Sequence, residues 1–153
     1  MRKLILMQGA PGCGKSTVAE ILRRHYETSS LPVPKVAVES ADNYWYEIIE
    51  PHLPEKYSWD SERSGQNHVW NQKLVLEDMQ NGYDVIIVDN TNTLRKEALP
   101  YIGVAMMFDY EISVVRVDPG VDVCIARQAG RPEDRRVPEE VIRAMHARME
   151  DLI

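Results

Sequence analysis

The sequence predicts an α/β domain in which a four-stranded parallel sheet is flanked by helices. Short apolar runs of strand length recur between segments with helical periodicity, which is typical of strands joined by crossover helices. A glycine-rich turn joins the first apolar run to the first helical segment. The chain has 153 residues, 44% of them hydrophobic, which is the usual size of one globular domain with one core. We therefore expect a single domain over residues 1–153.

Four segments have the length and composition of strands that are buried on both faces of a sheet. Each is dominated by valine, isoleucine, leucine or methionine, as expected when helices cover both sides of a parallel sheet. The predicted strands are Lys3–Gln8, Lys35–Val38, Asp84–Val88 and Glu111–Val117.

Helical patterns fill the intervals between these strands. The predicted helices are Ser16–Tyr26, Gly65–Met79, Leu94–Phe108, Val121–Ala129 and Glu139–Leu152. The spacing places Val18, Ile21 and Leu22 on one face of the first helix. Because proline clashes with the preceding turn of a helix, Pro100 predicts that the third helix divides into two pieces. The residues expected to face inward from the last helix are Val141, Ile142, Met145 and Met149.

The composition excludes several classes of protein. No run approaches the roughly 18 apolar residues that a membrane span needs, and the first residues reach a glycine turn too early for a signal peptide, so we expect a cytoplasmic protein. Cys13 and Cys124 are too far apart for a metal knuckle and the four histidines form no close pair, which argues against a structural metal. A net charge of -6 argues against a protein that coats duplex nucleic acid, although it is compatible with a local basic site. No protein partner can be inferred.

The segment Gly9–Ser16 fits the pattern G-x-x-x-x-G-K-[ST] between a predicted strand and a predicted helix. In such a loop, backbone N–H groups turn inward around phosphate, and the following helix points its positive end at the same place. Lys15 would reach the outer phosphates and Ser16 would ligate Mg²⁺. The alternative is a glycine turn that Ser16 caps. The predicted nucleotide-binding residues are Gly12, Cys13, Gly14, Lys15, Ser16 and Thr17, with Cys13 a spacer whose thiol has no chemical role.

Two carboxylates follow predicted strands and should overhang the carboxyl edge of the sheet, where ligands of open α/β folds bind. Asp89 follows the third strand, where phosphate-loop enzymes place a carboxylate near the metal. Asp42 follows the second strand and is the better candidate for a base that accepts a proton from an attacking hydroxyl. Alternatively, Asp89 belongs to a turn and helix cap, and Asp42 caps a short helix over Asn43–Ile49.

A locally basic segment lies between two predicted helices after the last strand. It carries four arginines and two acids over Arg127–Arg136. An arginine-bearing loop in this place is where kinase lids close over the transferred phosphate. The alternative is a solvated surface loop. Neither helix nor strand is predicted for Gly130–Arg136 or for Glu50–Ser64.

Several of these motifs together resemble one family. The motifs are Gly9-x-Pro11-Gly12-x-Gly14-Lys15-Ser16-Thr17, Ser40–Tyr44, Val88–Asn92, Arg127–Arg131 and Arg136–Pro138. They resemble the P-loop kinase domain of polynucleotide 5′-hydroxyl kinases, including the bacteriophage member. The eukaryotic relatives of that family are similar to this chain also through the motif His68-x-Trp70-Asn71-Gln72. The likeness spans nearly the whole chain and includes no phosphatase domain. It implies that Lys15 and Ser16 hold the phosphates of ATP and Mg²⁺.

The same resemblance implies roles for residues outside the glycine-rich loop. Asp42 would take the proton of the 5′-hydroxyl, and Asp89 would support the acceptor site besides the metal. Arg131 would stabilise the migrating phosphate, and Arg127 would bind the nucleotide as part of the same lid. The acceptor implied is the 5′ end of a nucleic acid.

The sequence departs from the family at one position that concerns the acceptor. The phage member has an arginine three residues after the base, where it grips the 3′-phosphate of the terminal nucleotide, and this chain has Trp45 there. Trp45 would bind substrate by stacking on a base, which is worth about 1–3 kcal/mol, or it is part of the core. By their spacing, Trp70 is assigned to the core and His68 to a possible substrate contact.

The sequence therefore predicts a P-loop kinase fold with a four-stranded parallel sheet and an arginine-bearing lid. The predicted activity is ATP- and Mg²⁺-dependent transfer of the γ-phosphate to a hydroxyl, foremost the 5′-hydroxyl of a polynucleotide. Three alternatives share the scaffold: a kinase for a hydroxymethylated base in DNA, a small-molecule kinase, and an ATP-binding module without transfer activity.

Overall fold

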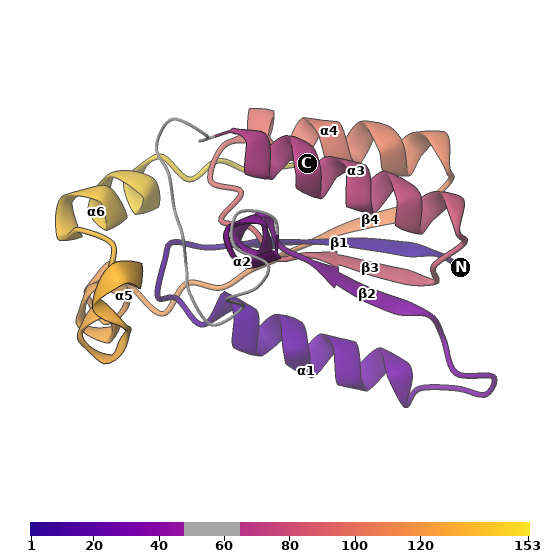
Figure 1. The fold of residues 1–153 in the computed structure, drawn as a ribbon, viewed down its shortest axis with the longest axis horizontal. Helices are drawn as coiled ribbons and strands as arrows, with labels where there is room; N and C mark the ends of the chain where they lie inside the picture. The colour runs from indigo at the N-terminus through magenta and orange to yellow at the C-terminus, as the bar shows by residue number, and fades with distance from the viewer. Residues whose placement is uncertain (48–64) are drawn as a thin grey trace.

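In the computed structural model, which describes residues 1–47 and 65–153, a parallel sheet lies between two layers of helices (Figure 1). The sheet has four strands in the order β2-β3-β1-β4. The strands are β1 (Lys3–Gln8), β2 (Val36–Glu39), β3 (Val85–Val88) and β4 (Glu111–Arg116). Each strand begins and ends within one residue of the predicted segment, which confirms the predicted α/β fold with four parallel strands.

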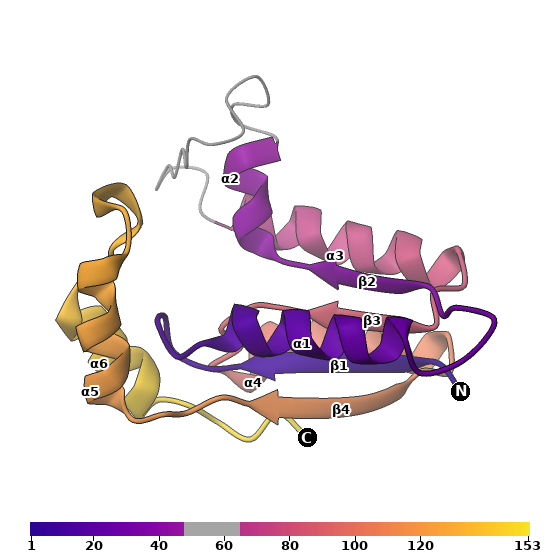
Figure 2. The same cartoon turned by 90° about the horizontal axis from the view of Figure 1, so that it is seen from below.

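The helices cover the two faces of the sheet and one of its ends. They are α1 (Lys15–Glu27), α2 (Tyr44–Glu47), α3 (Gln66–Gln80), α4 (Arg95–Met107), α5 (Val121–Ala126) and α6 (Glu139–Ala147). Short 3₁₀ turns occupy Ala41–Asn43, Arg127–Gly130 and Glu133–Arg135. Helix α1 lies on one face, α3 and α4 lie on the other, and α5 and α6 lie beyond the carboxyl ends of the strands (Figures 1 and 2).

Alternating residues of the central strands fill two separate cores. On the side of α3 and α4, Leu4 and Ile86 pack with Tyr101 and other buried side chains. On the side of α1, Ile5 and Ile87 pack with Ala19 and other side chains of that helix. This alternation fixes which residues of each strand face which helix layer.

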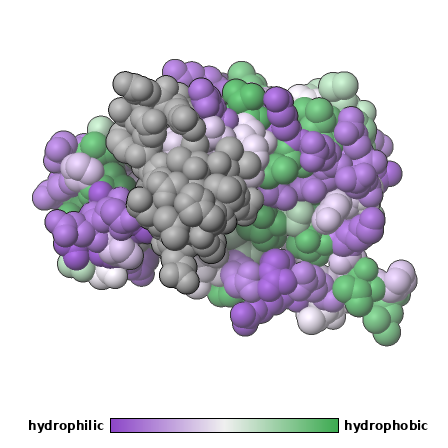
Figure 3. Space-filling view, viewed as in Figure 1, coloured by the Kyte–Doolittle hydropathy of each residue, from purple (hydrophilic) through white to green (hydrophobic). Residues whose placement is uncertain are grey.

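Two predictions about burial are wrong: that the last strand is buried on both faces, and that certain apolar helix residues face inward. β4 lies at an edge of the sheet, and all of its residues are exposed or half-buried, unlike those of the fully buried β3. Ile21 in α1 and Val141 in α6 are 61% and 41% exposed, respectively. In Figure 3 apolar side chains also reach the surface at the tip of the loop between α1 and β2, where Leu31 and Val33 are exposed.

Helix α4 is continuous through Pro100, so the predicted division into two pieces is wrong. Pro100 is an exposed residue in the second turn, and the carbonyl that loses its intrahelical partner can bond to water. Ala98, Tyr101 and Ala105 on the opposite side are buried against the sheet and hold both halves of the helix in place.

The two C-terminal helices are shorter than predicted. α5 ends at Ala126 and continues as a 3₁₀ turn, and α6 ends at Ala147. The remaining chain is extended because its main chain bonds elsewhere: the Glu150 N–H donates to the Thr93 carbonyl at 2.8 Å, and the Gln8 side chain donates to the Glu150 carbonyl at 2.7 Å. Within the described ranges, none of the helices is both long and apolar enough to cross a membrane.

Candidate active site

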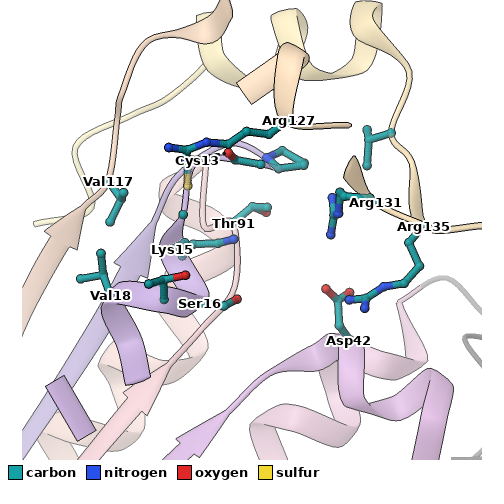
Figure 4. Close-up of a pocket in the computed structure, with 15 residues that line it drawn as sticks. Cys13, Lys15, Ser16, Val18, Asp42, Thr91, Val117, Arg127, Arg131 and Arg135 are labelled. Carbon is teal, nitrogen blue, oxygen red and sulfur yellow. Dashed lines mark hydrogen bonds between the residues drawn. The ribbon is translucent and has the colours of Figure 1, made fainter. Parts of the chain in front are cut away.

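The carboxyl ends of all four strands open into one cleft of about 690 Å³, a volume typical of small-molecule sites (Figure 4). The glycine-rich loop follows β1, Asp42 follows β2, Thr91 follows β3 and Val117 follows β4, and all of them line this cleft. The arginine segment closes the opposite side. The cleft therefore combines the glycine-rich loop, one carboxylate and several guanidinium groups.

The backbone of the glycine-rich loop requires two of its glycines. Gly12 and Gly14 have φ values of 86° and 95°, in the left-handed region that side chains disfavour. A Cβ on Gly12 would also lie 2.5 Å from the Cys124 carbonyl oxygen. The Cys13 thiol is buried against Gly9 and the helices beyond the sheet.

Helix α1 begins at Lys15, directly after the loop. Its N-cap is Gly14, which supplies no side-chain hydrogen bond, and its first turn contains no acidic residue. The free N–H groups and the positive end of the helix dipole are therefore available to an anion. Lys15, Ser16 and Thr17 line the cleft beside them.

Ser16 and Asp89 form a pair of oxygen ligands suited to Mg²⁺. The Ser16 hydroxyl donates to Asp89 Oδ2 at 2.7 Å. The other oxygen, Asp89 Oδ1, is buried and has no hydrogen-bond partner among the described residues, so it has capacity for a cation or its water shell. Mg²⁺ prefers a few carboxylate or hydroxyl oxygens and keeps several waters, so these residues fit it. In the described part of the chain, no group of three histidine, cysteine or acidic side chains offers a fuller metal cage.

The Asp42 carboxylate is exposed and lines the cleft. The short helical turn that carries it is capped by another residue, since the Ser40 hydroxyl accepts a hydrogen bond from the Asp42 N–H at 3.3 Å. Ser40, rather than Asp42, therefore caps this 3₁₀ turn. The part of the predicted helix beyond residue 47 lies outside the described residues.

Three arginines reach the cleft from the segment after α5. Arg127 donates to the Gly12 carbonyl at 3.2 Å, and Arg131 and Arg135 extend into the cleft on the side of Asp42 (Figure 4). The Arg135 guanidinium lies 5.5 Å from the centre of the Tyr46 ring, within the range of cation–π contact. The arginine segment thus lines the site, where the sequence left open a solvated surface loop.

Two further residues hold the arginine segment in place. Arg136 donates to the carbonyls of Arg131 and Ala129, at 3.0 and 3.2 Å. Gln128 is 7% exposed, and its side chain bonds to main-chain atoms of the glycine-rich loop, of α5 and of the chain before α6. Sequence patterns give no signal for Gln128, because a single glutamine in a basic segment resembles any surface residue.

Trp45 lies in the core and is 1% exposed, so its indole is not a stacking surface for a base in this structure. It packs edge-on against Tyr44, with 5.1 Å between ring centres. Trp70 is half-buried and touches the same tyrosine, whereas His68 is exposed. The aromatic residues after the candidate base therefore form part of the fold.

A buried polar network behind the cleft was not predicted from the sequence. Asn71 and Asn90 both donate to the Tyr101 hydroxyl, at 2.9 and 3.2 Å, and Asn90 accepts from the Ala41 N–H at 2.9 Å. Burial raises the pKa of Tyr101, and hydrogen bonds from the two asparagines lower it. These residues are distant in sequence, so only the folded chain brings them together.

A family model described as an AAA domain matches residues 4–152. The chain belongs to the AAA domain family. Human NEDD4-binding protein 2 is 30% identical to this AAA domain over 109 residues, which are 71% of this chain and 5% of that protein. The chain thus spans a small fraction of this curated relative.

Solved structures show the same fold. A chain of the Pnkp1/Rnl/Hen1 RNA repair complex aligns with a TM-score of 0.71 at 19% identity, over 97% of the AAA domain and 44% of that chain. Kti12 from Chaetomium thermophilum, solved with ADP-AlF3, aligns with a TM-score of 0.66 at 17% identity, over 97% of this chain and 80% of that one. The predicted P-loop kinase fold is thereby confirmed.

Proposed function

We propose that this AAA domain is an ATP- and Mg²⁺-dependent phosphotransferase whose acceptor is the 5′-hydroxyl of a polynucleotide. The observation that carries the proposal is the position of Asp42 in the same cleft as Lys15. A module that only binds nucleotide needs the lysine and the loop but has no use for an exposed carboxylate at the far side of the phosphate site. A transferase needs both.

The donor side of the cleft would hold ATP by its phosphates. Backbone N–H groups of the loop and the start of α1 would surround the β- and γ-phosphates, and Lys15 would neutralise their charge. Ser16 and Asp89 would hold Mg²⁺, directly or through water, and the ion when bound would draw charge from the leaving phosphate. Arg127, at the loop, would contact the nucleotide from the opposite wall.

The acceptor side would supply the base. The acceptor hydroxyl would approach the γ-phosphorus from the side of Asp42, and its oxygen would form the new bond as the bond to the bridging β–γ oxygen breaks. The proton of the hydroxyl would pass to the Asp42 carboxylate, and ADP would leave. Arg131, which reaches into the same space, would stabilise the negative charge of the phosphoryl group in transit.

Two observations support a polynucleotide as the acceptor. The motifs of the sequence resemble polynucleotide 5′-hydroxyl kinases, and a chain of an RNA repair complex shares the fold. With a net charge of -6 and a buried Trp45, the domain would hold a strand mainly through the few arginines at the cleft. Short single-stranded ends fit this arrangement better than long duplex contacts.

The proposal is tested by phosphate transfer from radiolabelled ATP. We expect labelling of 5′-hydroxyl RNA or DNA oligonucleotides by the wild type, and labelling that is slower by about 10²- to 10⁴-fold by Asp42→Asn at equal protein concentration. Hydroxymethyluracil DNA, nucleosides and small sugars serve as competing acceptors. Labelling of one of these competitors without any labelled oligonucleotide would contradict the polynucleotide assignment, and no labelling of any acceptor would contradict the transferase.

A further inference from the structure

We propose that Asn90 is a positioning residue for Asp42, which it holds at the cleft through the N–H group of Ala41. The inference rests on the proposed phosphotransfer and concerns the same site. Asn90 itself does not line the cleft, so its effect must be transmitted through the backbone that carries the base.

The Asn90 side chain is held at both of its polar ends. Its Oδ1 accepts from the Ala41 N–H at 2.9 Å, and its Nδ2 donates to the Tyr101 hydroxyl at 3.2 Å. The side chains of Asn90 and Tyr101 are 8% and 2% exposed, respectively. A buried amide with partners at both ends has one orientation, and the Asn90 amide therefore fixes the position of the Ala41 backbone relative to the sheet.

Ala41 connects the side chain of Asn90 to the turn that carries the candidate base, Asp42. It opens the 3₁₀ turn that contains Asp42, and it is itself 2% exposed. The other N–H groups of the turn bond locally, since those of Asp42 and Asn43 both bond to Ser40. Among the described residues, the partner of the Ala41 N–H is Asn90, so this bond attaches the start of the turn to the segment that follows β3.

The network has a cost in stability that points to a function. Asn71 Oδ1 is buried and has no hydrogen-bond partner among the described residues, although its Nδ2 donates to the Tyr101 hydroxyl. An apolar core at this place would leave no such group unsatisfied. We therefore assign the network to placement of the turn that carries the base.

The position of Asn90 in the chain links the two sides of the cleft. Its neighbour Asp89 bonds to Ser16 on the donor side, whereas the side chain of Asn90 bonds to Ala41 on the acceptor side. The peptide that joins Asp89 and Asn90 therefore determines the position of the candidate metal ligand relative to the candidate base, Asp42. Transfer is sensitive to such placement, because a misplacement of about 1 Å can lower the rate about 10²-fold.

Asn92 is a matched control in the same segment. Its side chain donates to the Met7 carbonyl at 2.8 Å, which lies on the donor side. Its φ of 43° is compatible with glycine, so Asn92→Gly removes the side chain without straining the backbone. Asn92→Gly is expected to weaken ATP binding, whereas Asn90→Ala is expected to leave it within about twofold of wild type, since the P-loop contacts remain.

The decisive experiment is a double-mutant cycle on transfer kinetics. We expect Asn90→Ala to lower kcat about 10- to 100-fold in the wild-type background. In an Asp42→Asn background the same change should lower kcat less than about twofold, because the base it positions is already gone. An equal loss in both backgrounds would overturn the proposal, since a general structural defect acts whether or not the base is present.

A second variant and a second readout keep the test independent of folding and of activity. Tyr101→Phe keeps the core volume and removes only the hydroxyl, and it should lower kcat in the same direction but less than Asn90→Ala. Amide hydrogen exchange should show faster exchange at Ala41 in Asn90→Ala, with the protection of β1 retained. Unchanged exchange at Ala41 overturns the proposal even if the wild type phosphorylates no acceptor, which would by itself contradict only the proposed function.

Discussion

Ser16 and Asp89 are joined by a hydrogen bond of 2.7 Å from Oγ to Oδ2, although they lie on different elements of the fold. Ser16 belongs to the first turn of α1, and Asp89 is the residue that follows β3. Neighbouring parallel strands bring the two to the same edge of the sheet, since β1 and β3 pair directly. The bond orients one carboxylate oxygen and leaves the other available to a cation.

Replacement of Asp89 by asparagine should weaken the dependence of the proposed phosphate transfer on Mg²⁺. The amide oxygen can still accept from Ser16, but the negative charge is lost. We expect the Mg²⁺ concentration for half-maximal transfer to rise about 10- to 100-fold, as for other residues that support a bound metal. Asp84→Asn is the matched control, because Asp84 lies at the opposite end of β3 and bonds to the Lys35 N–H. An unchanged Mg²⁺ dependence would contradict the metal assignment.

Lys15→Met should remove most of the transfer activity without unfolding the domain. Lys15 lines the cleft, and the change removes a charge while it keeps a side chain of similar length. Circular dichroism should be unchanged, whereas ATP affinity and turnover both fall. Lys73→Met, on the exposed face of α3, serves as the control. Wild-type turnover by Lys15→Met would mean that phosphate binds elsewhere.

Arg131→Ala should lower turnover more than it weakens acceptor binding. A guanidinium that acts on the charge of the transition state contributes little to the ground state. We also expect a shallow dependence of acceptor KM on salt, because few phosphates are neutralised in this acidic chain. Arg143→Ala removes the same charge from an ion-paired position on α6 and should change neither value. A steep salt dependence would indicate a basic groove beyond these arginines.

Trp45→Ala should destabilise the fold, and any loss of activity should result from this lower stability rather than from lost contact with substrate. A tryptophan that is 1% exposed leaves a large cavity when truncated, which costs about 3–5 kcal/mol of unfolding free energy. Trp45→Phe fills part of the space and should restore much of the stability with an unchanged acceptor KM. Urea unfolding and acceptor kinetics measure the two quantities. A raised acceptor KM in Trp45→Phe at unchanged stability would instead favour stacking on a base.

Asp78→Asn should make stability less dependent on pH. Burial raises the pKa of Asp78 above its ordinary value of 3.8, a hydrogen bond with Glu39 lowers it, and the charge of Glu77 raises it. Well below pH 3.8 the carboxyl is protonated in both the folded and the unfolded chain. As pH rises, the unfolded chain loses this proton first, so the contribution of Asp78 to stability falls until the folded pKa is passed.

The asparagine variant carries no charge at any pH, so its advantage over wild type should appear above about pH 4 and grow until the pKa of Asp78 in the folded protein is passed. Urea unfolding at several pH values measures it. Glu77→Gln changes the net charge equally from an exposed position, and it should give a much smaller effect. Equal effects of the two variants would mean that only the net charge matters.

Local sequence patterns predicted the sheet and the glycine-rich loop well. The four strands are apolar runs, and a buried strand followed by a glycine loop has few alternatives. Burial at the edge of the sheet was predicted less well, since apolar composition does not tell an outer strand such as β4 from an inner one. The effect of Pro100 was overestimated, because packing of the opposite helix face outweighs one lost hydrogen bond.

The residues of the candidate site likewise fall into those that sequence patterns predicted and those that only the folded structure shows. The sequence indicated Lys15, Asp42 and Arg131, and the structure places all three around one cleft. Trp45 occupied the position of a family arginine, and only the packing of the folded chain shows that it is buried. The network around Asn90 carries no local pattern, because its bonds depend on long-range contacts between the segment after β3, helix α4 and the turn before α2.

The side chain of Gln128 makes the arginine segment a fixed wall of the cleft. It donates to the carbonyls of Pro11 and Cys124, at 3.4 and 3.2 Å, and accepts from the Val137 N–H at 3.0 Å. Swinging the segment away from the glycine-rich loop would break its bond to Pro11 and leave buried polar groups unpaired. The conformational entropy of this loop is therefore lost when the domain folds rather than when ATP binds. Under the proposed function, Arg131 would meet the nucleotide from a loop that is already ordered, which is the condition under which a guanidinium stabilises a transition state most effectively.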